Sequence, residues 1–277
     1  MKVFSEPMKL VSYSAILSCL IFIVVTSPVF AERLKKGDTI HVCGDGAGWP
    51  PYTFFKHEKG EKTKEIIGYD IEVLNSIFKK HGINAIFEMP PWNRCVKLAE
   101  TGIKYQIALS ASYSKERDRK FILTRDYYRI SPYYFYSRNK YQKDIDITVK
   151  EDFLQYKVCG LYGYNYMGFN LPLMKIDRGA KNFDLVIKKT HKGRCDLFIA
   201  RYEILVGFDQ IGVNYLERDL GYAPIPGATL EKFYMLISRN YKHANQLKKI
   251  IDSGIAEMEK SGKLKKIIEM YIGKSRQ

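Results

Sequence analysis

The strongest constraint on the fold is a repeated alternation of short apolar segments with longer amphipathic ones. Residues 39–43, Thr-Ile-His-Val-Cys, have the length and composition of a first strand. Residues 69–81 then carry apolar side chains at helical spacing, and Gly82 can end that helix in the left-handed conformation. Chains that alternate in this way build α/β folds with largely parallel sheets and helices on both faces.

The alternation continues to the C-terminus, with a second run beginning near Thr148. The further elements that we expect are strands at 84–88, 105–109, 133–137, 157–161, 195–200 and 233–238, and helices at 92–101, 183–191, 243–259 and 264–271. Ser114 is placed to cap a short helix, and Thr148 with Glu151 matches a capping box. Hydrophobic residues make up 46% of the chain, which is enough to build real cores.

Residues 1–31 match a secretory signal peptide. Lys2 and Lys9 give a positive start, residues 15–25 are almost entirely apolar, and Ala31 ends a plausible cleavage sequence. The alternative is a membrane anchor, but a spanning helix needs about 20 apolar residues and this run is shorter. We therefore expect cleavage after Ala31 and export.

Four cysteines follow this segment: Cys43, Cys95, Cys159 and Cys195. An even number in an oxidising compartment favours disulfides, for which three connectivities are possible. Zinc is the alternative, but the spacings are wide, there is no CxxC, and the five histidines are scattered. The sequence therefore predicts disulfide bonds, no metal site and no cofactor.

The formal net charge is +15, yet lysine and arginine are spread along the chain without a dense basic block. This distribution favours a solvated basic surface over a nucleic-acid site. The chain has no G-x-S-x-G, no P-loop and no metal-ligand cluster. We therefore predict a binding protein and not an enzyme.

In α/β sheets, ligands bind at the carboxyl ends of the strands. The loops that occupy such positions are 44–52, 110–117, 162–166 and 200–203. Around them the chain resembles the family 3 extracellular solute-binding proteins, which include the amino-acid receptors of ABC importers. The resemblance spans about residues 38–272 and rests on Gly-Tyr-Asp at 68–70, the serine-rich turn ending in Glu-Arg at 110–117, and Gly-Arg-Cys-Asp at 193–196.

The resemblance implies a type II periplasmic binding protein fold. Such a fold has two α/β lobes, each a mainly parallel sheet flanked by helices, and a hinge that closes them on a ligand. Lobe 1 would comprise 32–138 and 231–277, and lobe 2 would comprise 139–230. Because a bond between lobes would resist hinge motion, the resemblance favours pairing Cys43 with Cys95 and Cys159 with Cys195.

Arg117 matches the residue with which the family holds the carboxylate of its ligand. A guanidinium pairs bidentately with a carboxylate, so the residue type suits this role. The alternative is an exposed arginine on a first helical turn. Ser110 and Ser112 match polar positions beside it, although polarity at a strand end explains them equally well.

Trp49 and Trp92 resemble the aromatic residues that sandwich the ligand, and Tyr52 is a weaker match. The alternative for each is a place in the core. The lobe 2 loop whose amides meet the ligand's carboxylate is matched by Gly163, Tyr164 and Asn165, which could equally form a packed turn.

Arg201 departs from the family pattern, because amino-acid receptors carry an acidic residue there for the ligand's ammonium. Glu203 is the nearest acidic replacement. Two arginines facing one cleft would suit a ligand with two anionic groups; the alternative is that Arg201 points to solvent.

The resemblance therefore implies a periplasmic monomer that captures a small polar, carboxylate-bearing ligand, an amino acid or related anion, for an ABC permease. No nucleic-acid partner is expected. The alternatives are a sensor that signals to a membrane receptor, an orphan binding protein, and a dehydratase-like enzyme with Asp45 or Glu203 as its acid.

Overall fold

The first of two larger sheets has the strand order β4-β1-β5-β13-β6, with β7 beside β13. Its strands are β1 Thr39–Cys43, β4 Asn84–Glu88, β5 Ile107–Ser112, β6 Phe121–Leu123, β7 Tyr128–Ile130 and β13 Glu231–Ser238. The pairs β1–β4 and β1–β5 are parallel, whereas β13 is antiparallel to β5, β6 and β7. The coordinates are a computed structural model that describes residues 1–3, 33–172 and 175–272.

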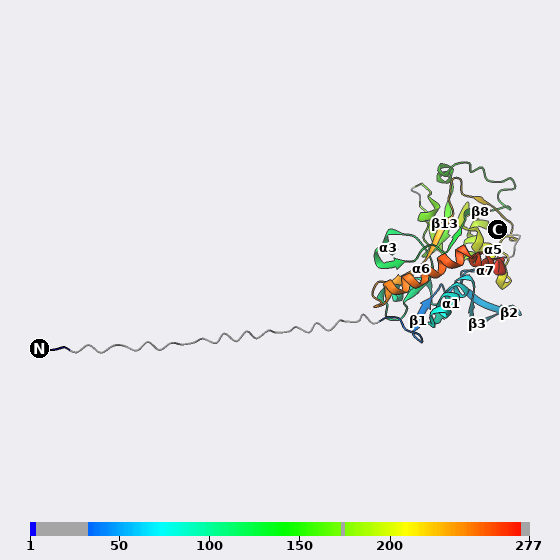
Figure 1. Ribbon diagram of the computed structural model, residues 1–277. Helices are drawn as coiled ribbons and strands as arrows, with labels where there is room; N and C mark the ends of the chain where they lie inside the picture. The colour runs from blue at the N-terminus through cyan, green and yellow to red at the C-terminus, as the bar shows by residue number, and fades with distance from the viewer. Residues whose placement is uncertain (4–32, 173–174, 273–277) are drawn as a thin grey trace. The chain divides into compact units, whose positions relative to one another are not determined.

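Five helices belong to this part of the chain: α1 Tyr69–His81, α2 Trp92–Thr101, α3 Lys115–Lys120, α6 Ala244–Lys260 and α7 Lys263–Ile272. The two C-terminal helices α6 and α7 pack against α1 (Figure 1). A separate hairpin, β2 Phe54–Glu58 with β3 Glu61–Ile67, was not expected from the sequence. Its second strand is mostly charged and exposed, so it lacks the apolar face that predicts a strand.

The second sheet has the order β10-β9-β11-β8-β12. Its strands are β8 Pro132–Ser137, β9 Val158–Leu161, β10 Asp177–Ala180, β11 Leu197–Arg201 and β12 Leu220–Pro224, and its helical elements are α4 Phe183–His191, α5 Tyr202–Gly207 and the 3-10 helices η1 Lys150–Gln155, η2 Met167–Phe169 and η3 Phe208–Ile211. Strands β9, β10 and β11 pair in parallel, while β8 is antiparallel to both β11 and β12.

The α/β class and the two-sheet architecture are confirmed, and each sheet is parallel along one side and antiparallel along the other. The Thr148–Glu151 capping box is not formed. Instead the Asp152 carboxylate accepts hydrogen bonds from the amides of Thr148 (2.8 Å) and Val149 (2.9 Å) at the start of η1. A 3-10 turn brings Asp152 rather than Glu151 under these amides.

The chain passes between the two sheets near Ser131 and again between β12 and β13. The lobe boundaries themselves stay a prediction. Since β8 pairs within the second sheet, we would place the first boundary near residue 131 instead of 138.

Both cysteine pairings that the resemblance favours are confirmed. Cys43 at the end of β1 is bonded to Cys95 on α2, with their Cα atoms 5.7 Å apart. Cys159 on β9 is bonded to Cys195, which precedes β11, with Cα atoms 5.9 Å apart. Each bond therefore joins elements that belong to one sheet and its helices.

Gly68 fixes the loop 49–52 against the start of α1. Its φ is +129°, and a Cβ atom there would lie only 2.2 Å from the carbonyl oxygen of Tyr52, so only glycine fits. The amides of Tyr69 and Asp70 donate to the carbonyls of Pro51 (3.1 Å) and Tyr52 (2.9 Å). The helix N-terminus thus holds the loop that carries Trp49.

The predicted signal peptide and its cleavage site after Ala31 lie outside the described residues, apart from residues 1–3. Within the described part of the chain, we find no helix with the length and apolar character that crossing a bilayer requires.

Candidate functional site

The strand-end loops meet around a small, partly open cavity of about 30 Å³. The predicted ligand-binding residues that line it are Trp49, Trp92, Ser110, Ser112, Arg117, Tyr164, Asn165 and Arg201. The rule that ligands bind at strand carboxyl ends therefore gathers most of the predicted set in one place.

Asp70 lies beneath the cavity, in the first turn of α1, and is fully buried. It contacts the lining residues Thr53 and Ser110. Its carboxylate accepts hydrogen bonds from the hydroxyls of Thr53 (2.5 Å), Ser110 (2.5 Å) and Tyr127 (2.8 Å). Burial raises the pKa of Asp70 to about 6, although the three hydroxyls oppose the shift. The Ser110 hydroxyl is thus committed as a donor to the protein.

Arg117 projects from the first turn of α3, where the Ser114 hydroxyl accepts from its amide (3.1 Å) as a helix cap. Its Nη1 donates to the carbonyl (2.7 Å) and hydroxyl (3.1 Å) of Ser112. Burial, and then the charge of Arg201, lower the pKa of Arg117 to about 10, so it is cationic at neutral pH. Its other two guanidinium nitrogens have no hydrogen-bond partner among the described residues.

The aromatic wall beside Arg117 is formed by Trp92 on one side and Trp49 further in. The guanidinium carbon of Arg117 lies 5.5 Å from the Trp92 ring centroid, within range of a cation–π contact. Trp49 is buried, donates from Nε1 to the Tyr128 hydroxyl (3.1 Å) and packs edge-on against Tyr164 (5.3 Å between centroids). Trp49 is therefore both a core residue and a wall of the cavity.

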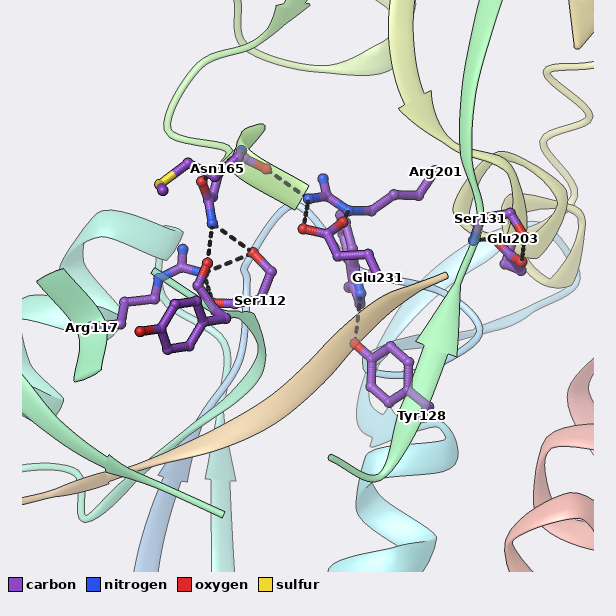
Figure 2. A network of polar contacts seen from close by, with 11 residues as sticks. Ser112, Arg117, Tyr128, Ser131, Asn165, Arg201, Glu203 and Glu231 are labelled. Atoms are coloured by element: carbon purple, nitrogen blue, oxygen red, sulfur yellow. Dashed lines mark hydrogen bonds and ion pairs between the residues drawn. The ribbon is translucent and has the colours of Figure 1, made fainter. Parts of the chain in front are cut away.

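Asn165 joins the second-sheet part of the chain to the first (Figure 2). Its Nδ2 donates to the Ser112 hydroxyl (3.0 Å) and to the Tyr113 carbonyl (2.8 Å), while its Oδ1 accepts from the exposed Met167 amide (3.1 Å). Ser112 consequently binds Arg117 from one side and Asn165 from the other.

Arg201 ends β11 and is only 3% exposed, so it does not point to solvent. Its Nε and Nη2 donate to the two carboxylate oxygens of Glu231, at 2.7 and 3.0 Å, and Nη2 also donates to the Asn165 carbonyl at 2.6 Å (Figure 2). Glu231 begins β13 in the first sheet. The positive charge of Arg201 is therefore compensated by the carboxylate of Glu231.

Three predicted residues do not line the cavity. The amide and the hydroxyl of Ser131 each donate to one carboxylate oxygen of Glu203, both at 2.8 Å. Burial raises the pKa of Glu203. The Tyr52 ring stacks on Tyr128 in the core at 3.8 Å. Gly163 has a φ of +77° and lies on the outer side, near Asn93.

Asp45 and Glu231 complete the charges at the site. Asp45 lines the cavity, accepts from the Ala47 amide (3.0 Å) and the Tyr164 hydroxyl (3.4 Å), and has its pKa raised by burial. The sequence marked Asp45 only as a possible acid and missed Glu231 entirely. The glycine-rich turn around Asp45 was a usable signal, whereas nothing in the spacing links Glu231 to Arg201.

The cavity is thus lined by Arg117 with two free guanidinium nitrogens, by Arg201 whose charge Glu231 compensates, and by the carboxylate of Asp45. This combination can bind the two ends of a zwitterion without metal or covalent chemistry. Among the described residues, one group has metal-ligand spacing: Cys159, Asp177 and Cys195. Both of its cysteines are already joined in the second disulfide.

Comparison with known proteins agrees with this architecture. The chain is 24% identical over 244 residues to the probable amino-acid-binding protein YxeM of Bacillus subtilis, covering 86% of this chain and 85% of that protein. A similar solved structure is AbpA of Streptococcus pneumoniae, an amino acid ABC transporter substrate-binding protein bound to L-arginine. It has a TM-score of 0.66 and 19% identity, with 84% of this chain and 94% of that one covered.

The ancestral amino-acid-binding protein AncCDT-1, described as a precursor of cyclohexadienyl dehydratase, has a TM-score of 0.63 at 19% identity, covering 84% of this chain and 95% of that one. At these identities the structural likenesses establish the two-lobed fold alone. The model of the bacterial extracellular solute-binding proteins, family 3, matches residues 40–274, which is most of the chain. The chain belongs to that family.

Proposed function

We propose that this protein captures a small zwitterion, an amino acid or a close relative, between its lobes and delivers it to an ABC permease. The observation that carries the proposal is that Arg117 and Asp45 line one cavity and that two nitrogens of Arg117 are free to donate. Arg117 would hold the carboxylate of the ligand and Asp45 its ammonium.

The internal pairing of Arg201 removes the main objection to a zwitterionic ligand. A lone buried arginine would repel an ammonium, but Glu231 neutralises Arg201 through two hydrogen bonds. Glu203 is committed to Ser131 and does not take the ammonium role in this proposal. Asp45 replaces it from the opposite side of the cleft.

An amino acid is larger than a cavity of about 30 Å³, so its entry requires the lobes to separate. Separation would break the hydrogen bonds of Asn165 to Ser112 and Tyr113 and re-form them around the ligand. Ser131 donates two hydrogen bonds to Glu203 and lies at one of the two points where the chain passes between the sheets. A hinge would bend at these points.

The test begins with a thermal-shift screen of the twenty amino acids, dicarboxylates and simple sugars, because a ligand of the folded state raises the melting midpoint. Calorimetric titration of the hit would follow with Arg117→Ala and the matched control Arg119→Ala, which lies on the exposed side of α3. We expect Arg117→Ala to weaken binding at least about 30-fold, because truncating one partner of a buried charge pair costs at least about 2 kcal/mol. Undiminished affinity in Arg117→Ala would refute the assignment.

One observation favours a second candidate, an enzyme that uses Asp45 as its acid. Burial raises the pKa of Asp45 inside the cavity, as a general acid requires, and one structural neighbour is described as a dehydratase precursor. Incubating the protein with each screening hit and recording proton NMR spectra separates the two. An unchanged ligand supports binding, and a new product that disappears in Asp45→Asn supports catalysis.

The partner and location follow from the same proposal. We expect a periplasmic monomer whose closed form meets a permease; crosslinking in membranes that captures a receptor kinase would instead support sensing. Light scattering that gives twice the mass of one chain would contradict the monomer.

A further inference from the structure

A second, open cleft lies directly outside the cavity. Its volume is about 710 Å³, and it shares Trp92, Arg117, Tyr164 and Asn165 with the cavity as common walls. Helices α2 and α3 form one side, and the loop after β9 with Arg178 on β10 forms the other. The cavity and the cleft are therefore neighbours that meet at these four side chains.

The outer cleft is strongly cationic. Its charged lining residues are the cations Lys97, Lys115, Arg117, Lys120 and Arg178 and the acids Glu100 and Glu116. Both acids pair with the single cation Lys120, at 3.3 and 3.0 Å. In the described part of the chain, no ion pair involves Lys97, Lys115 or Arg178, so the lining, with five cations against two acids, keeps an excess of positive charge.

Arg117 lies at the boundary between the two spaces, with Nη1 held by Ser112 and its other nitrogens free. A ligand carboxylate placed on Arg117 therefore has the outer cleft beside it. Among the described residues that line the cavity, the second arginine is Arg201, and Glu231 compensates its charge. A second anionic group of the ligand would consequently find free cations in the outer cleft and not in the cavity.

We propose that the ligand extends past Trp92 into the outer cleft and carries a second anionic group there, as a short peptide with an acidic second residue does. The inference rests on the proposed function and narrows its ligand class. Since Lys97, Lys115 and Arg178 are exposed, each contributes a modest, salt-dependent preference and not the bulk of the affinity.

The test compares calorimetric titrations of the purified protein with L-alanine, L-alanyl-L-glutamine and L-alanyl-L-glutamate at low and high salt. We expect the acidic dipeptide to bind about tenfold more tightly than its neutral isostere at low salt, and the difference to shrink at high salt. The double variant Lys97→Glu/Arg178→Glu should remove this preference, measured as the ratio of the affinities for the two dipeptides. The control Lys249→Glu/Lys266→Glu changes the net charge equally at exposed sites on α6 and α7 and should keep the preference.

Equal affinity for the two dipeptides, or a preference that survives the cleft variant, would overturn the inference. If only L-alanine or other free amino acids bind, and do so through Arg117, the proposed function stands and the extended ligand fails. If no probe and no free amino acid binds, both fail.

Discussion

The buried pair of Arg201 and Glu231 makes a quantitative prediction for Glu231→Gln. The two side chains are 3% and 5% exposed, and their two hydrogen bonds are 2.7 and 3.0 Å long. Removing one partner of such a pair leaves an uncompensated buried charge, which costs about 3–5 kcal/mol. For a chain of this size, each kcal/mol lowers the melting temperature by about 2–4 °C, so we expect a decrease of about 6–20 °C.

Urea denaturation followed by circular dichroism would measure the decrease in the free energy of unfolding, and thermal denaturation the decrease in melting temperature. Glu151→Gln is a matched control, because Glu151 is exposed and has no ion pair within the described residues; it should change the free energy of unfolding by less than about 0.5 kcal/mol. The double variant Arg201→Met/Glu231→Leu removes both charges and should recover most of the lost stability. A Glu231→Gln protein within about 1 kcal/mol of wild type would show that Arg201 finds another partner, and the reasoning would be refuted.

Two further predictions concern Asp70, which lies beneath the cavity, and Asn165, which links the two sheets. Asp70 has a pKa of about 6 when folded against a usual 3.8, so its contribution to the free energy of unfolding is greatest below pH 4 and is lost as the pH rises through 6. Relative to Asp70→Asn, wild type should therefore lose up to about 3 kcal/mol between pH 4 and pH 7 in urea titrations, and a constant difference would contradict the raised pKa. Asn165→Ala removes the two hydrogen bonds to Ser112 and Tyr113, so the closed form should be less populated and the radius of gyration from X-ray scattering should increase. An unchanged radius would mean that other contacts hold the lobes.

The sequence predicted the regular parts of the fold well, because periodicity reports burial. The strand 39–43 and the helix 69–81 have apolar residues on the side that the core covers, and both form as expected. The charged hairpin 54–67 was missed because its exposed second strand carries no such pattern. Short strands such as β10 are held by their neighbours and not by their own composition.

The site was predictable where position along the chain decides it. Arg117 and Trp49 follow strands, so the strand-end rule and the family resemblance both find them. The role of Glu231 depends instead on a contact with Arg201, which lies 30 residues away and in the other sheet. Likewise, the burial of Asp70 depends on three hydroxyls brought together only by folding. Tertiary contacts of this kind leave no spacing rule in the sequence.

The two disulfides have a practical consequence for measurement. All four cysteines in the described part of the chain are bonded, and each bond stays within one sheet and its helices. Met167 is 63% exposed and lies two residues after Asn165, which contacts Ser112. A cysteine introduced there could be labelled without competition from another free thiol in the described part of the chain. A dye attached there would change its surroundings as the cleft opens and closes, which makes this chain a scaffold for an optical sensor of its own ligand.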